Sequence, residues 1–464
     1  MMSAKKMEVL RAFLGKLPEA VADKLARAVE ADRLVGGGAL PHDAILESLR
    51  PALQRLSPAR RRITPLRLFC LPFEDLLSSE PRARKQKGRI LRQSIPRVWK
   101  WLAHEILPQR TAEFVRDVRA AALAGECERA DELASAFWRD AAAALHAALA
   151  DGTKEMSARL ALGDDGGRDD AAEMALMLSV GDEVFAIHAQ VPRPIETMTD
   201  DILWAYRALY DRLVQTAPDA APFVSIIAMS RLERPWEALR LPLMISRQTQ
   251  DTLISSTDMG LVGELLFSDI EMHAAAIRAV RHQEFDPDDL VHHGHIFATL
   301  SAGLVKEVGV RRDGKWGQRL LSDRAAIAEV MEGLMERAPR EILGVFAMHK
   351  GRFGGKGPRS PDISKPLDPE KLDRAMRYAR LMSGCRSFAA AGSFGAALRD
   401  SYDEVTGELT RYTEELVREL RAAEGETKVR ADQYFWAAAD LTAIIRGEEE
   451  AELLRRRGRA ALAA

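Results

Sequence analysis

Four of the ten histidines in this chain lie within one short stretch, "HQEFDPDDLVHHGH", residues 282–295. Imidazoles interleaved with carboxylates are ligand types that bind Zn²⁺ or Fe(II), so the stretch raises the question of a metal site. On a helix, Asp288, His292 and His295 stand at positions i, i+4 and i+7 and share one face. A tight helical hairpin would also bring His282 near His292. One hypothesis is therefore a divalent-metal site in a metal-dependent enzyme, with the ligands Asp288, His292, His295 and His282.

The same acids have a structural interpretation. Asp286 suits a helix N-cap, Pro287 suits the first helical position, and Asp288 and Asp289 place negative charge where the helix dipole favours it. A buried stripe follows at helical spacing, and we expect His293 to lie in it as a neutral core side chain. Its apolar members are Leu290, Phe297, Leu300 and Leu304. Because the stretch contains no HExxH or ExxH motif, we favour a helix junction over a metal motif.

The helix before this junction has a start signal of its own. Ser268 and Glu271 form a capping-box pattern, which predicts a helix beginning there and ending near His282.

A basic segment is the second candidate site. Between residues 58 and 100 there are twelve Lys or Arg residues and three acids, a net charge of +9 in a chain whose formal charge is −2. Such a segment could bind nucleic acid, an anionic membrane surface or an acidic protein partner. Alternatively, Trp99 and Trp101 begin an ordinary core helix after an exposed arm. The candidate anion-binding or partner-binding residues are Arg60, Arg61, Arg62, Arg82, Arg84, Lys85, Lys87, Arg89 and Arg92.

Recognisable catalytic motifs are absent from the sequence. The "AGSFG" stretch at 391–395 has Ala391 where a nucleophile elbow needs glycine. The glycine-rich stretch 348–371 is not a phosphate-binding loop, because Gly357 stands where a Ser or Thr should bind magnesium. Cys70, Cys127 and Cys385 are widely separated, so we expect buried free thiols rather than a disulfide framework or a zinc site.

The composition indicates which elements position these residues. Of 464 residues, 47% are hydrophobic and only 6% aromatic, and Ala and Leu recur throughout, which favours helices. Helix-like segments of about 12 to 20 residues alternate with short breaks, as in an array of antiparallel helix pairs. The stretch "FVSIIAM", 223–229, has no evident strand partner, and we interpret it as a buried helix. We therefore predict an all-α fold, a multi-helical array with a C-terminal helical hairpin.

Two breaks divide the chain. "GDDGGRDD", 163–170, has no apolar residue to bury and is the expected linker. We expect an N-terminal helical region over 1–162, a central helical domain over 171–347, a Gly/Pro-rich loop over 348–371 and the hairpin region over 372–464. In the last region an apolar seam over 398–416 could form a homodimer interface, although packing within its own chain is the commoner outcome. The seam residues are Leu398, Tyr402, Val405, Leu409, Tyr412 and Leu416.

The functional expectation is a non-enzymatic helical interaction or scaffold protein that uses the basic segment to bind an anion or a protein partner. The alternatives are the metal-dependent enzyme and a nucleic-acid-binding protein. Apolar runs are too short to span a membrane, and the first twenty residues lack a signal-peptide core, so we expect a cytoplasmic protein.

Overall fold

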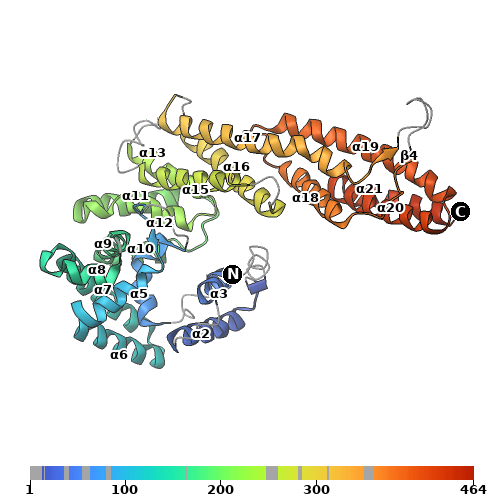
Figure 1. The fold of residues 1–464 in the computed structure, drawn as a ribbon. Coiled ribbons are helices and arrows are strands. Elements are labelled where there is room, and N and C mark those ends of the chain that lie inside the picture. The colour runs from blue at the N-terminus through green and yellow to red at the C-terminus, as the bar shows by residue number, and fades with distance from the viewer. Residues whose placement is uncertain are drawn as a thin grey trace. The chain divides into compact units, whose positions relative to one another are not determined.

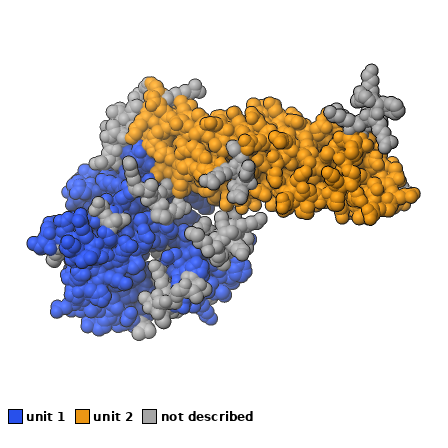
Figure 2. Space-filling model, viewed as in Figure 1, with its two compact units in different colours: residues 1–249, 253–265 blue, residues 250–252, 266–464 orange. Residues whose placement is uncertain are grey.

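The computed structural model describes residues 13–14, 16–35, 41–54, 63–79, 85–163, 165–246, 260–280, 285–310, 313–349 and 360–463. Helices dominate these residues, and the only strands in the described ranges are four segments of two residues each (Figure 1). The prediction of an all-α fold is confirmed. The chain forms two compact units, one of residues Met1–Thr249 and Leu253–Leu265, the other of Gln250–Thr252 and Leu266–Ala464 (Figure 2).

Unit 1, coloured blue in Figure 2, is a set of packed helices with one short parallel strand pair, in which Leu77 pairs with Ile90. Its elements are α2 (Glu19–Val35), α3 (His42–Gln54), α4 (Pro65–Cys70), η2 (Leu71–Leu76), β1 (Leu77–Ser78), β2 (Ile90–Leu91), α5 (Ser94–Trp101), η3 (Leu102–Ile106), α6 (Pro108–Ala124), α7 (Cys127–Ala150), η4 (Gly152–Lys154), α8 (Glu155–Leu162), α9 (Asp165–Ser179), α10 (Gly181–Gln190), α11 (Asp200–Thr216), η5 (Pro218–Ala220), α12 (Phe223–Arg231), η6 (Pro235–Leu239) and α13 (Arg240–Ser246).

The core of unit 1 forms around α7, which packs against α6 and α9. Phe137 of α7 stacks on Phe114 of α6 with ring centroids 4.1 Å apart, and the Nε1 of Trp138 donates a hydrogen bond to the Leu68 carbonyl at 2.9 Å. The expected buried helix at 223–229 is present as α12, where the side chains from Phe223 to Met229 are all buried. Adjacent aromatic side chains of α7 therefore pack against different neighbouring elements, Phe137 against α6 and Trp138 against α4.

Unit 2 is a bundle of long helices with one antiparallel strand pair, in which Met348 pairs with Pro361. Its elements are the part of α15 (Leu261–Arg278) from 266 onward, α16 (Pro287–Val308), α17 (Lys315–Leu343), β3 (Met348–His349), β4 (Ser360–Pro361), α18 (Pro369–Cys385), α19 (Gly395–Ala422), α20 (Gly425–Arg446) and α21 (Glu448–Leu462). The predicted C-terminal hairpin corresponds to α19 and α20, which pack together and are joined by a turn in which Gly425 has a φ of +58°.

Close helix packing in unit 2 depends on small residues. A Cβ at Gly294 of α16 would lie 2.2 Å from Cζ of Phe388, which follows α18. A Cβ at Gly384 of α18 would similarly lie 2.5 Å from the Val291 side chain of α16. Glycine at these two positions lets α16 and α18 approach more closely than larger residues would allow.

Several expectations about organisation differ from the structure. Residues 165–170, expected as part of a linker, form the first turns of α9, and Asp170 is completely buried. The division between compact units falls near residues 250–266, not at 163–170 or within 348–371. The loop prediction for 348–371 holds in part, since β3 and β4 bracket it and α18 begins at Pro369; residues 350–359 lie outside the described ranges.

The apolar seam over 398–416 packs within its own chain. Val405, Leu409 and Leu416 are buried, and α19 packs against α17, α20 and α21. The seam is therefore packed inside unit 2, and of its six residues Tyr402 is partly exposed while the other five are buried. Of the three cysteines, all of which are free thiols, Cys385 is buried and Cys70 and Cys127 are partly exposed.

Candidate functional site

The histidine-rich stretch begins helix α16 as the sequence predicts. The side chain of Asp286 accepts hydrogen bonds from the backbone N–H groups of Asp288 at 2.9 Å and Asp289 at 3.4 Å. Leu290, Phe297 and Leu304 are buried along the predicted stripe. The preceding helix differs from the prediction, because α15 begins at Leu261, so Ser268 and Glu271 lie within the helix instead of at its start.

The proposed metal ligands are not gathered into a site. Asp288, His292 and His295 are all exposed along α16, and His282 lies outside the described residues. Within the described ranges, no group of three or more His, Cys, Asp or Glu side chains is placed to hold a metal ion. Sharing a helix face therefore did not gather these three side chains into a metal-binding group among the described residues.

His293, which was expected to be a core side chain, forms a close contact with another histidine. It is partly buried, and its Nδ1 lies 2.8 Å from Nδ1 of His273, a buried residue of α15. A hydrogen bond between two imidazole nitrogens requires one ring to donate and the other to accept. His273 was not singled out from the sequence, because a lone histidine within an apolar helix carries no motif.

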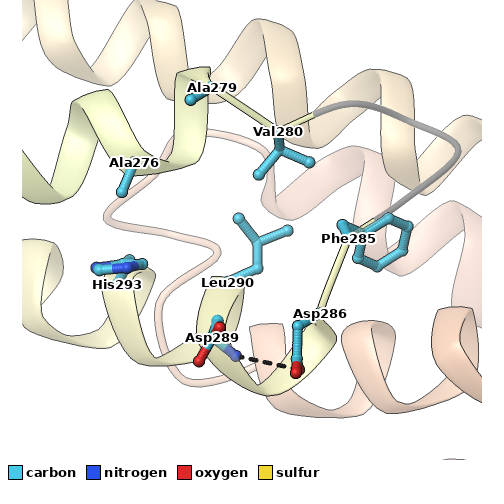
Figure 3. A pocket seen from close by; sticks show the side chains of 8 residues that line it. All are labelled: Ala276, Ala279, Val280, Phe285, Asp286, Asp289, Leu290 and His293. Carbon is cyan, nitrogen blue, oxygen red and sulfur yellow. Dashed lines mark hydrogen bonds between the residues drawn. The ribbon is translucent and has the colours of Figure 1, made fainter. Parts of the chain in front are cut away.

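A cavity of about 360 Å³ lies beside this histidine pair in unit 2. Figure 3 shows His293 and Asp289 one helical turn apart on α16, with Ala276 and Ala279 of α15 on the opposite side. The lining residues are Ala276, Ala279, Val280, Phe285, Asp286, Asp289, Leu290 and His293. Its wall combines apolar side chains with the His293 ring and two carboxylates, and the carboxylate of Asp286 is already occupied in capping α16.

The basic segment is partly built into unit 1. The Nζ of Lys85 lies 2.7 Å from Oδ1 of Asp170 and 2.9 Å from Oε2 of Glu173, and it donates a 2.6 Å hydrogen bond to the Arg89 carbonyl. Burial raises the pKa of Glu173 in spite of the nearby Lys85 charge. Asp170 also accepts hydrogen bonds from Leu91 N and Ser94 Oγ. Lys85 therefore forms ion pairs with two internal carboxylates of α9.

The other candidate basic residues have different environments. Lys87 is exposed, with its Nζ 5.8 Å from the Phe223 ring centroid, while Arg89 and Arg92 are partly buried. Gly88, with a φ of +86°, lets this segment approach α12, since a Cβ there would lie 2.2 Å from Cδ1 of Ile226. The remaining candidates, Arg60, Arg61, Arg62, Arg82 and Arg84, lie outside the described residues.

A buried group of charges in unit 1 was missed by the sequence reasoning. Asp75, whose side chain is 1% exposed, lies 2.8 Å from Nε2 of His188 and 3.5 Å from a terminal guanidinium nitrogen of Arg231. It also forms an ion pair with Arg193. We name the following seven side chains the arginine cluster: Arg67, Glu74, Asp75, His188, Arg193, Tyr206 and Arg231.

Backbone hydrogen bonds hold the two central arginines of the cluster in place. The N–H of Ile195 donates to the Arg231 carbonyl, and the N–H of Glu233 donates to the Ile195 carbonyl, both at 2.9 Å. These bonds tie the segment after α10, which contains Arg193, to the end of α12, which contains Arg231. A terminal nitrogen of Arg231 also donates to the Val191 carbonyl at 2.8 Å. Both guanidinium groups are thereby directed at one carboxylate.

The charges of the cluster alter several pKa values. Burial alone would raise the pKa of Glu74, but the nearby Arg67, Arg193 and Arg50 of α3 outweigh it and hold this pKa below 4.5. Burial lowers the pKa of Arg193 to about 10, so the guanidinium is charged at neutral pH. Burial raises the pKa of Tyr206 to about 12, so the phenol is neutral and can donate a proton in a hydrogen bond.

Three polar atoms of the cluster are left without a hydrogen bond. Nε of Arg193, Nε of Arg231 and Oδ1 of Asp75, which forms the ion pair with Arg193, are buried, and none has a hydrogen-bond partner among the described residues. The Tyr206 side chain interacts with Arg231 both electrostatically and through a side-chain hydrogen bond. Buried donors without partners are uncommon in native proteins and mark places where a ligand or ion can bind.

The signal in the sequence for this cluster was weak but present. Glu74 and Asp75 interrupt the apolar run "LFCLPFEDLL", and Arg231 ends the apolar helix that begins at Phe223. Charged residues embedded in otherwise apolar segments are buried with them and must find partners. The sequence could not show that the partners come from α4, η2, α10, α11 and α12, because those contacts join residues far apart in the chain.

Within the described ranges, no helix is both long enough and apolar enough to cross a membrane. Comparison with known proteins gives no relative: no protein-family model matches the chain, and no curated protein and no solved structure is significantly similar to it.

Proposed function

We propose that this chain is a non-enzymatic helical binding protein that recognises the oxyanion group of a ligand through the arginine cluster of unit 1. The observation that supports the proposal is the combination of charged guanidiniums with two buried donors, Nε of Arg193 and Nε of Arg231, that have no hydrogen-bond partner among the described residues. A guanidinium offers its Nε and a terminal nitrogen as two parallel donors, which matches the two oxygens of a carboxylate or the edge of a phosphate.

The burial of the cluster limits what can reach it. The side chain of Arg231 is 6% exposed and that of Arg193 is 18% exposed, so access is through Arg193 and His188, which is 13% exposed. A small ligand or a single projecting group fits this entrance, whereas a nucleic-acid duplex would need an exposed basic surface. The proposal therefore keeps the expected anion-binding activity but places it at Arg193 and Arg231 instead of in the basic segment.

The test is a binding measurement with small oxyanions. Phosphate, sulfate and acetate, each balanced with chloride to constant ionic strength, are titrated into the full-length protein and followed by calorimetry and by thermal denaturation. We expect saturable binding of at least one of them. The double variant Asp75→Asn with Arg193→Met removes a charge of each sign and should abolish binding, while Arg116→Met, at a residue that is 71% exposed, should not change it.

A parallel titration addresses nucleic acid. If the protein instead bound single-stranded DNA with a steep salt dependence, and neutralising Arg60, Arg61 and Arg62 abolished that binding, nucleic acid would replace the small oxyanion as the ligand. Absence of binding by phosphate, sulfate and acetate would overturn the proposal.

A further inference from the structure

His273 and His293 form a pair of imidazoles inside unit 2. Their Nδ1 atoms are 2.8 Å apart and their ring centroids 5.1 Å apart, although one residue belongs to α15 and the other to α16. His273 is only 8% exposed, and His293 is partly buried. Imidazole is the side chain that most often binds transition metals such as Zn²⁺. Tertiary packing therefore holds two metal-binding nitrogens next to each other.

The separation of the two Nδ1 atoms is close to that of two ligands on one metal ion. Zn²⁺–N bonds are about 2.0–2.1 Å long, so two nitrogens at a tetrahedral angle are about 3.3 Å apart. The observed 2.8 Å is shorter by only about 0.5 Å, which a small rotation of either ring supplies. In the hydrogen bond one Nδ1 carries a proton, and that proton must move to Nε2 of the same ring before both Nδ1 atoms can bind an ion.

The cavity beside the pair offers both room and negative charge. Its volume is about 360 Å³, and Figure 3 shows His293 on its wall with Asp289 one helical turn earlier. The Asp286 carboxylate lines the same cavity. Two neutral imidazoles leave the charge of a divalent ion uncompensated, and carboxylates at this distance offset part of it. Since no group of three or more His, Cys, Asp or Glu side chains in the described ranges is placed to hold a metal ion, the protein itself supplies two ligands here.

We propose that His273 and His293 bind a divalent transition-metal ion of the Zn²⁺ class through their Nδ1 atoms, with water in the adjoining cavity as the remaining ligands. The ion links α15 to α16, so its binding stabilises unit 2. This site is separate from the arginine cluster and does not depend on the proposed oxyanion binding. It also differs from the ligand set expected from the sequence, because Asp288, His292 and His295 are exposed and take no part in it.

The experiment titrates Zn²⁺ and Mg²⁺ into the full-length protein after treatment with a chelator, with calorimetry and thermal denaturation as readouts. Mg²⁺ prefers oxygen ligands, so it reports binding by the carboxylates alone. The double variant His273→Ala with His293→Ala removes the proposed ligands. The matched control is His292→Ala with His295→Ala, which removes two exposed histidines of the same helix. The single variant His293→Gln keeps a hydrogen-bonding side chain and serves if the first double variant fails to fold.

We expect one Zn²⁺ per chain to bind the wild type and the His292/His295 variant with equal affinity and to raise the melting temperature of both. Replacing His293, alone or together with His273, should weaken this binding by at least about tenfold, because losing even a group that only supports a zinc ligand costs about 10- to 100-fold in affinity. Mg²⁺ should bind far more weakly than Zn²⁺.

Three results would overturn the proposal. The first is an unchanged Zn²⁺ affinity in the variants that lack His293. The second is loss of Zn²⁺ binding from the His292/His295 variant, which would show adventitious binding by exposed histidines. The third is Mg²⁺ binding as tight as that of Zn²⁺, which would assign the ion to the carboxylates. None of these results affects the proposed oxyanion binding in unit 1.

Discussion

The ammonium group of Lys85 lies 2.7 Å from the carboxylate of Asp170, whose side chain is completely buried. Lys85 is itself only 15% exposed and also pairs with Glu173, so one cation serves two carboxylates of α9. The ion pairs fasten the segment that includes β2 to α9, together with the hydrogen bond from Leu91 N to Asp170. Lys85, a candidate binding residue in the sequence, therefore takes part in the internal packing of unit 1.

Replacing Lys85 should destabilise unit 1 strongly. Lys85→Met leaves Asp170 and Glu173 buried without their cation, and removing one partner of a buried ion pair costs about 3–5 kcal/mol. Lys87→Met, two residues away at an exposed site, should lower the free energy of unfolding by no more than about 1 kcal/mol. Urea denaturation of both variants checks the difference, and equal losses would contradict the structural role of Lys85.

Acidic pH should lower the stability of unit 1 through protonation of Glu74. The folded-state pKa of Glu74 is held below its ordinary value of 4.5, so its contribution to stability is present above that pH and is lost as the pH falls through the folded pKa. Each unit of pKa difference corresponds to about 1.4 kcal/mol. Glu74→Gln should flatten the dependence of unfolding free energy on pH below 4.5. Glu196→Gln, at an exposed position, should keep the wild-type dependence of unfolding free energy on pH. The same dependence in the wild type and both variants would show that Glu74 does not cause the loss of stability in acid.

Two glycine substitutions should change the stability of unit 2 in opposite directions. Gly294→Ala forces a Cβ to within 2.2 Å of the Phe388 ring and should cost about 1–3 kcal/mol as α16 and Phe388 move apart. Gly407→Ala, within α19, meets no atom within 4 Å and should stabilise the helix by about 0.5–1 kcal/mol. Thermal denaturation distinguishes them, and two shifts of the same sign would be inconsistent with the close approach at Gly294.

The hydrogen bond between His273 and His293 should be measurable as a coupling energy. In a double-mutant cycle built from His273→Ala and His293→Ala, the loss of stability in the double variant should differ from the sum of the two single losses. The difference should be about 0.5–1.5 kcal/mol, the usual net contribution of one hydrogen bond. The measurement is chemical denaturation at neutral pH. Additive losses would mean that the 2.8 Å contact between the two rings contributes nothing to the stability of unit 2.

The exposed histidines of α16 give a direct test of the metal hypothesis. Because Asp288, His292 and His295 are exposed and form no metal-binding group among the described residues, the double variant His292→Ala with His295→Ala should have the metal content and melting temperature of the wild type. Plasma emission spectrometry on both proteins gives the metal content. Stoichiometric metal in the wild type that disappears from the variant would restore the metal hypothesis, with His282 as a further ligand.

Local signals in the sequence predicted the elements well where the physical cause is local. The cap at Asp286 and the buried stripe of α16 follow from hydrogen bonding and periodicity within one helix, and both are present. The linker prediction for 163–170 failed, because Asp170 has a polar environment supplied by Lys85, Ser94 and Leu91, which no local pattern reveals. From the sequence alone, an acidic residue in a glycine-rich stretch is predicted to be exposed, because its distant ion-pair partner cannot be identified.

The sequence alone therefore determined the all-α class, the start of α16, the buried helix at 223–229 and the C-terminal helical hairpin, since each depends on residues near one another in the chain. Only the tertiary structure decided which charged residues are functional candidates. Asp75, Arg193 and Arg231 are separated by up to 156 positions, yet they share one buried ion-pair network. Ion pairing acts over a few ångströms in space and is indifferent to distance along the chain, so only packing could bring this site together.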